Sequence, residues 1–198
     1  MAKVMSISRL RTGTDGKGLT TLVGFSGCPL KCRYCLNDEC HDSKIGKDYS
    51  VEELIKLVSI DSIYFGITGG GITFGGGEPL LNADFIEEFC KKCDKRWKIR
   101  IETSLNVDRE AIETLVDYID KWFVDIKDTN PGIYKEYTET DNSRMLDNLK
   151  FLYDKVGPEG LHLRIPLIPR YNTQEDIERT KYLLRGYACK KEYFTYKC

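Results

Sequence analysis

The chain of 198 residues is long enough to bury a hydrophobic core and suits one domain, which we expect to span residues 1–198. Its 30 Lys and Arg nearly balance 31 Asp and Glu, and the net charge of -1 gives no support for a nucleic-acid or anionic-membrane partner. No stretch approaches the length of a membrane span and residues 1–12 lack the apolar core of a signal peptide, so the sequence favours a cytoplasmic protein.

Short strand-like runs alternate with amphipathic helical runs six times along the chain. The expected strands cover residues 20–25, 72–74, 98–103, 122–126, 161–168 and 193–197. The expected helices start after the N-cap residues Ser50, Asp108 and Thr173 and also cover residues 83–96 and 145–153, with a Pro-Gly turn at 131–132. Because parallel strands need long crossovers, this order predicts an α/β protein with a partial (β/α)6 barrel of parallel strands and outer helices.

Three of the expected strands are apolar on one face and polar on the other. The polar faces carry Arg100, Glu102, Asp125, Lys127, His162 and Arg164. A parallel strand covered by helices on both faces would be apolar throughout, so these faces indicate a polar cavity inside the barrel. The alternative is that the charges only pair with one another in a wet barrel interior.

Eight cysteines without an export signal favour metal or redox chemistry over disulfide bonds. Cys28, Cys32 and Cys35 follow the first expected strand with the spacing C-x3-C-x2-C, at the strand end where barrel enzymes place their chemistry. Three thiolates can hold three irons of a 4Fe-4S cluster and leave the fourth iron open for a ligand. The alternative is a zinc site completed by Cys40 or His41.

The other cysteines allow two interpretations. Cys90 and Cys93 could form an auxiliary cluster with Cys189 and Cys198, or they could be small residues packed beneath a helix. His162 is expected to be a hydrogen-bonded barrel residue rather than a metal ligand.

The loop C-x3-C-x-Tyr-C after a first strand resembles that of the radical S-adenosylmethionine (SAM) enzymes. The segment GGGEP at residues 75–79 resembles the motif that receives the amino group of SAM in these enzymes, although alone it could be a plain turn. The resemblance implies a radical SAM core with the 4Fe-4S cluster at Cys28, Cys32 and Cys35.

More narrowly, the chain resembles the activating enzymes of glycyl-radical enzymes, of the pyruvate formate-lyase activating type. The matching stretches are DGKG at 15–18, YCLN at 34–37, GGGIT at 69–73, DIK at 125–127 and Arg164. The resemblance implies that SAM is bound by Tyr34, Asn37, Gly76, Gly77, Glu78, Thr103, Asp125, Lys127 and Arg164. It also implies a monovalent cation held by Glu102 and Asp125 beside the methionine carboxylate.

The implied activity is reductive cleavage of SAM to a 5'-deoxyadenosyl radical, which takes a hydrogen atom from a backbone glycine of a partner glycyl-radical enzyme. A flavodoxin- or ferredoxin-type protein would supply the electron. The turn at Asp15 and Gly16 is expected at the barrel mouth, where a protein loop would enter. The alternatives are a radical SAM enzyme acting on a small molecule or ribosomal peptide, and a zinc- or cluster-binding interaction module.

Overall fold

Eight strands form one sheet in the computed structural model, which describes residues 1–42 and 44–196. The strands are β1 (Ala2–Arg11), β2 (Thr20–Phe25), β3 (Lys47–Tyr49), β4 (Gly71–Gly76), β5 (Lys98–Thr103), β6 (Lys121–Asp125), β7 (Leu161–Leu167) and β8 (Lys190–Thr195). The helices are α1 (Val51–Val58), α2 (Ser62–Thr68), α3 (Ala83–Lys92), α4 (Arg109–Leu115), α5 (Pro131–Thr138), α6 (Ser143–Gly160) and α7 (Gln174–Leu183). Short 3-10 turns are η1 (Asp38–His41), η2 (Ser59–Asp61), η3 (Pro79–Asn82) and η4 (Leu184–Gly186). None of the helices in these described ranges is long and apolar enough to cross a membrane.

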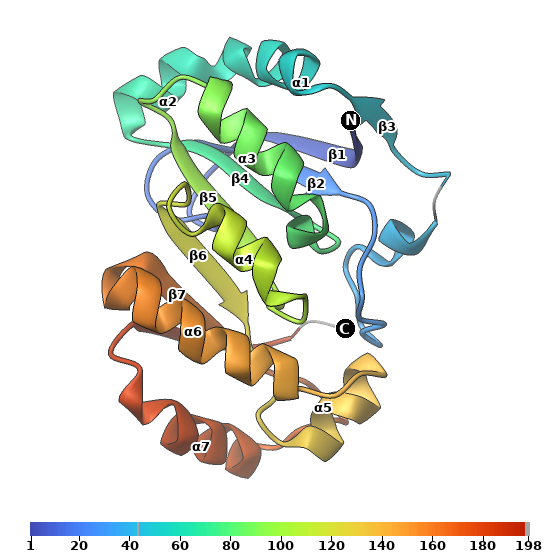
Figure 1. The fold of residues 1–198 in the computed structure, drawn as a ribbon. Helices are drawn as coiled ribbons and strands as arrows, with labels where there is room; N and C mark the ends of the chain where they lie inside the picture. The colour runs from blue at the N-terminus through green and yellow to red at the C-terminus, as the bar shows by residue number, and fades with distance from the viewer. Residues whose placement is uncertain (43, 197–198) are drawn as a thin grey trace.

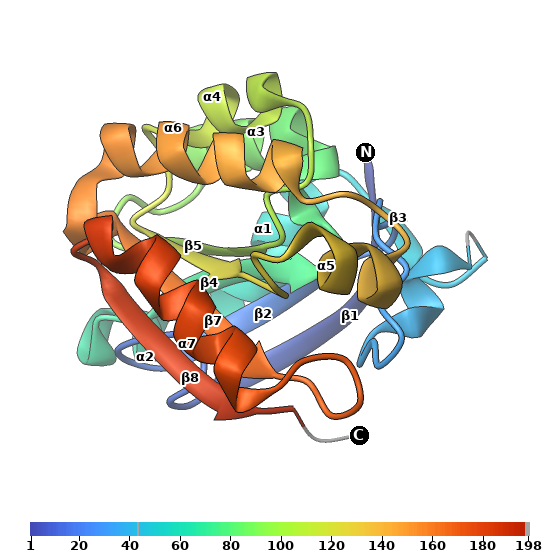
Figure 2. The same cartoon turned by 90° about the horizontal axis from the view of Figure 1, so that it is seen from below.

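The sheet has the order β3-β1-β2-β4-β5-β6-β7-β8. The six strands from β2 to β8 in this order are parallel to their neighbours, and helices cover the outer side of the curved sheet (Figures 1 and 2). The predicted α/β fold, a partial barrel of six parallel strands with outer helices, is confirmed. The sequence did not predict β1 and β3, which add to one edge in antiparallel pairing.

Several boundaries differ from the expected ones; for example, α6 covers Ser143–Gly160 instead of residues 145–153. The Pro-Gly pair opens α5 instead of a turn, because the side chain of Asn130 accepts from the backbone N–H groups of Gly132 and Ile133. Helix α3 ends at Lys92, because Cys93 is extended. Strand β8 begins at Lys190, three residues early, and its expected end at position 197 lies outside the described residues.

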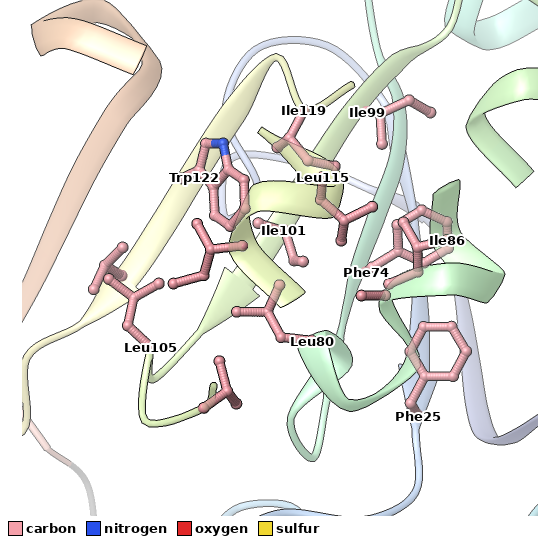
Figure 3. Close-up of a cluster of buried hydrophobic side chains, with 14 of the residues drawn as sticks. Phe25, Phe74, Leu80, Ile86, Ile99, Ile101, Leu105, Leu115, Ile119 and Trp122 are labelled. Carbon is pink, nitrogen blue, oxygen red and sulfur yellow. The ribbon is translucent and has the colours of Figure 1, made fainter. Parts of the chain in front are cut away.

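The core lies between the outer face of the sheet and helices α3 and α4 (Figure 3). Ile101 of β5 and Trp122 of β6 are fully buried there, together with Ile86 of α3 and Leu115 of α4. Each such side chain contributes about 1.5–3 kcal/mol by leaving water. The apolar strand faces therefore point to the helices as the sequence predicted, which leaves the polar faces inside the barrel.

The loop between β1 and β2 closes the barrel at the amino ends of the parallel strands. Arg100 Nη2 donates to the carbonyl oxygen of Lys17 at 2.6 Å, and Thr20 Oγ1 donates to Asp15 Oδ2 at 2.9 Å. A Cβ at Gly16 would lie 3.4 Å from the ring of Phe123. The turn at Asp15 and Gly16 was expected at the barrel mouth, which was wrong. It precedes β2 and lies at the amino ends of the strands, whereas the cysteine loop follows β2 and lies at their carboxyl ends. Arg100 belongs to this closed amino end of the barrel.

Candidate radical SAM site

Backbone hydrogen bonds tie the cysteine loop to the carboxyl end of β4. Gly77 N–H donates to Phe25 O at 2.9 Å, and Glu78 N–H donates to Gly27 O at 2.7 Å. A Cβ at Gly77 would lie 2.1 Å from Gly27 O, so only glycine allows this approach. Gly27 N–H in turn donates to Cys40 O at 2.7 Å, which draws η1 against the loop. Glycine in the GGGEP segment therefore allows the end of β4 to lie against the start of the cysteine loop.

Helix α5 holds the other side of the same loop. Lys31 N–H donates to Thr138 O at 2.9 Å, and Arg33 N–H donates to Tyr137 O at 3.1 Å. Arg33 also forms an ion pair with Glu139 at 3.1 Å. The loop is thus fixed from two sides by protein contacts.

Four thiols open into one cavity of about 840 Å³ inside the barrel. They belong to Cys28, Cys32, Cys35 and Cys40. Burial raises the pKa of Cys28 to about 12 and raises the pKa of Cys32, where Lys127 acts in the opposite direction. Buried neighbouring thiols of raised pKa need a positively charged group to become thiolates.

The three loop thiols form the kind of donor set that a 4Fe-4S cluster uses. No three His, Cys, Asp or Glu side chains in residues 1–42 and 44–196 are arranged to hold one metal ion. The zinc alternative relied on Cys40 or His41 as the fourth ligand; Cys40 lines the cavity beside the other three thiols, whereas His41 is exposed outside it. An iron-sulfur cluster is wider than one ion and binds thiolates from a short loop, as the spacing of Cys28, Cys32 and Cys35 predicts.

The inner face of β5, β6 and β7 carries three charged side chains, and Lys127, two residues after β6, extends them to a row of four. Arg164 Nε donates to Asp125 Oδ1 at 2.7 Å, and Arg164 Nη1 donates to Glu102 Oε1 at 3.0 Å. Lys127 Nζ donates to Asp125 Oδ2 at 3.0 Å. The four side chains pair with one another, as one interpretation of the polar face predicted, and they also line a cavity, as the other predicted.

The ion pairs set the protonation states of this row. Burial would raise the pKa of Asp125, but Lys127 and Arg164 outweigh it and hold this pKa at about 2. Burial raises the pKa of Glu102, and Arg164 opposes that shift. We therefore expect Asp125 to stay charged at neutral pH between its two cations.

Glu78 lies at the junction of β4 and β5 and is 1% exposed. Its Oε1 accepts from Thr103 Oγ1 at 2.7 Å and from Leu80 N–H at 3.2 Å. Its Oε2 accepts from the N–H of Ser104 at 2.9 Å and from its Oγ at 2.7 Å. Burial raises the pKa of Glu78, and the Ser104 and Thr103 donors oppose the shift. The carboxylate thus joins the ends of two strands at the cavity wall.

The structure brings together nearly all the residues that the sequence singled out. The cavity is lined by Cys28, Cys32, Cys35, Asn37, Gly76, Gly77, Glu78, Glu102, Thr103, Asp125, Lys127 and Arg164. Asn37 Nδ2 donates to Gly76 O at 3.1 Å. Tyr34 is the exception, because its ring packs edge-on against Tyr137 and Tyr171 outside this lining.

The sequence analysis missed several residues of the cavity wall. Phe123 of β6, Ser104 after β5, and Phe194 and Tyr196 at the end of the chain also line the cavity. Phe123 could have been found, because it shares the period-two face of Asp125. Ser104 and Tyr196 follow their strands, where no periodicity applies.

Of the remaining cysteines that the structure describes, Cys189 lies in a different part of the fold from the neighbouring pair Cys90 and Cys93. Cys90 and Cys93, at the end of α3, are 5% and 6% exposed and belong to the hydrophobic core, which favours the packing interpretation. Cys189 precedes β8, at the far end of the sheet from the strands β4 and β5 that α3 connects. Cys198 lies outside the described residues.

Residues 22–183 match the Radical SAM superfamily. The chain is 29% identical over 168 residues to the pyruvate formate-lyase 1-activating enzyme of Escherichia coli (strain K12), covering 82% of this chain and 66% of that enzyme. It is 30% identical over 154 residues to the indoleacetate decarboxylase activating enzyme of Tractidigestivibacter scatoligenes, covering 74% of this chain and 48% of that enzyme. The matched part of the chain thus spans about two thirds or less of the length of these relatives.

The fold is also similar to the structure of a radical SAM methyltransferase from Sphaerobacter thermophilus. The TM-score is 0.67 at 16% identity, and the match covers 98% of this chain and 67% of the other. The matched range 22–183 contains the cysteine loop, the GGGEP segment and the charged row. With this fold and this loop, the chain belongs to the radical SAM superfamily.

Proposed function

We propose that this chain activates a glycyl-radical enzyme by taking a hydrogen atom from one of its glycines. The observation that carries the proposal is that three loop thiols and a charged barrel face open into the same cavity. A bound cluster and SAM would then be adjacent. When bound, the 4Fe-4S cluster supplies the electron that cleaves SAM into methionine and a 5'-deoxyadenosyl radical. Similarity to activating enzymes of two glycyl-radical systems supports the choice of partner.

Each part of the cavity has a role in this proposal. Cys28, Cys32 and Cys35 hold the cluster. Lys127 and Arg164 offer positive charge to the carboxylate of SAM. The residues proposed to surround the rest of SAM are Asn37, Gly76, Gly77, Glu78, Thr103 and Asp125, whereas Tyr34 lies outside the cavity lining. The buried side chains of Leu30 and Phe123 also line the cavity and help to exclude water, which protects a reactive radical.

The partners follow from the same proposal. A glycyl-radical enzyme is the protein substrate, and a flavodoxin- or ferredoxin-type protein is the electron donor. A monovalent cation at Glu102 and Asp125 stays a hypothesis, because the guanidinium of Arg164 lies between these two carboxylates.

The cluster assignment is tested by anaerobic reconstitution. We expect about four irons per chain and formation of 5'-deoxyadenosine from SAM after reduction. Replacing Cys28, Cys32 and Cys35 by Ala should remove both the iron and the product. The matched control is Cys189→Ala, a partly buried cysteine outside the loop, which should keep both. Zinc in place of iron, or unchanged iron in the triple variant, would contradict the assignment.

The partner assignment is tested with a glycyl-radical enzyme encoded near this gene. Reduced, cluster-loaded protein, SAM and the candidate partner are mixed and examined by electron paramagnetic resonance. We expect the doublet of a glycyl radical, and its loss when the acceptor glycine is replaced by Ala. Turnover of a small molecule or ribosomal peptide, with no doublet from several candidate partners, would favour the alternative radical SAM activities.

A further inference from the structure

The charged row of the barrel places a guanidinium between two carboxylates. Arg164 reaches Asp125 with Nε at 2.7 Å and Glu102 with Nη1 at 3.0 Å. The two acids come from different strands, since Asp125 is the register partner of Arg164 on β6, whereas Glu102 lies on β5. The guanidinium bridges them over the ring of Phe123, 5.7 Å from its centroid.

The charges of this row balance without any added ion. Lys127 and Arg164 supply two positive charges against the two negative charges of Asp125 and Glu102, and each of the four side chains is less than a third exposed. A monovalent cation between the carboxylates would have to displace a bonded guanidinium. It would also add a third positive charge in a partly desolvated place, where repulsion is stronger than in water.

The guanidinium also suits the position better than a small ion does. Its planar group of donors can bind two carboxylates in fixed directions, and it never loses its proton. Neither of its two bonds uses Nη2, so this nitrogen can still donate to the carboxylate of a ligand in the cavity.

We propose that Arg164 acts as a built-in cation at Glu102 and Asp125, so that SAM binding by this protein needs no sodium or potassium ion. The inference rests on the proposed SAM site and replaces the cation hypothesis there. Arg164 is a positioning residue in this role, because it holds the two carboxylates apart and, together with Lys127, balances their charge.

The test measures SAM binding to the cluster-loaded protein without reductant, so that no turnover takes place. Dissociation constants are compared in potassium chloride, sodium chloride and choline chloride at equal ionic strength. We expect the three values to agree within about twofold. A wild-type protein that binds SAM about tenfold more tightly in sodium or potassium than in choline would overturn the proposal.

A variant makes the test specific to Arg164. In Arg164→Gln the two carboxylates lose their shared cation, so binding should weaken in choline and recover by about tenfold in sodium or potassium. The control is Arg179→Gln, an exposed arginine paired with Glu175 and Asp176, which should show no ion dependence. Failure of every ion to restore binding in Arg164→Gln would also count against the proposal.

The remaining readouts separate a folding defect and a wrong function from a wrong inference. If Arg164→Gln does not fold, the wild-type comparison decides alone, and Arg164→Lys, which keeps the charge, should show less ion dependence than the glutamine variant. Thermal unfolding of the wild-type protein in the three salts, without SAM, should give equal midpoints, and a midpoint raised only by sodium or potassium would contradict the proposal. Failure of the glycyl-radical assay would leave both measurements unaffected.

Discussion

Glu78 was expected to bind a ligand, but its surroundings also give it a role in the fold. The resemblance assigns it to the amino group of SAM, but its oxygens already accept four hydrogen bonds from Leu80, Thr103 and Ser104. A carboxylate so bonded in a buried place is part of the fold as well as of the cavity wall. Its loss should therefore affect stability before it affects any ligand.

Replacement of Glu78 by Ala should lower the free energy of unfolding by roughly 3 kcal/mol, because buried donors of Thr103 and Ser104 lose their acceptor. Chemical denaturation measures the change. Glu88→Ala, at an exposed position of α3, serves as control and should change stability by at most about 0.5 kcal/mol. Equal effects of the two replacements would show that the carboxylate of Glu78 is not needed by the fold.

His162 is predicted to make stability depend on pH. Burial, with Lys190 and Lys121 nearby, lowers the pKa of His162 to about 4 from 6.5. Below pH 6.5 His162 binds a proton in the unfolded chain but not in the folded protein. The free energy of unfolding therefore falls as the pH drops from about 6.5 to about 4. The shift corresponds to about 3 kcal/mol.

The variant His162→Asn should flatten this part of the stability curve, measured by denaturation between pH 7 and pH 4. The control is His41→Asn, at the exposed second histidine of the chain, which should keep the slope caused by His162. The same slope in wild-type protein and His162→Asn would assign the effect to other groups.

At the scale of elements, the end of β4 is the part that joins the cofactor loop to the barrel. Two backbone hydrogen bonds link it to the end of β2 and the segment that follows, and the close approach depends on the missing side chain of Gly77. Helix α5 holds the same loop from the other side through Thr138 and Tyr137. The loop that carries the thiols is thus ordered by the elements around it.

Replacing Gly77 by Ala should lower both stability and iron content, because the new Cβ would meet Gly27 O at 2.1 Å and push the cysteine loop away. We expect a loss of about 3 kcal/mol in unfolding free energy, measured by denaturation beside iron analysis. Gly66→Ala is the matched control, since a Cβ there meets nothing within 4 Å. Because Gly66 is in α2, that change should stabilise by about 0.5–1 kcal/mol. Full iron loading of Gly77→Ala would contradict the proposed contact.

At the scale of the whole molecule, cavity and core lie on opposite faces of one curved sheet. The outer face packs on helices, and the inner face carries the charged row and meets the thiols at its carboxyl end. A cluster bound there is held by a loop that contacts β4, η1 and α5. Binding should therefore stabilise the fold as a whole.

Reconstitution of the cluster should raise the thermal midpoint of unfolding by about 5 °C or more, because the cluster binds the folded state and not the unfolded one. Anaerobic calorimetry of the protein before and after reconstitution measures the shift. The variant without Cys28, Cys32 and Cys35 should show none. A shift in that variant would place the stabilising iron elsewhere.

The sequence by itself determined the alternation of strands and helices, the inward polar face and the cysteine spacing. Each of these is local, since period two within a strand decides which side chains share a face, and one loop contains all three proposed ligands. The sequence did not predict strands β1 and β3, because antiparallel edge strands with mixed burial carry only a weak hydrophobic pattern.

Only the tertiary structure decided how these parts meet. The register of β5, β6 and β7 brings Arg164 between Asp125 and Glu102, although 62 residues separate Arg164 from Glu102 along the chain. The return of η1 to Gly27 brings Cys40 to the cavity, and the packing of α5 turns Tyr34 away from it. These contacts depend on distances between segments that are remote in sequence, and no local period encodes such distances.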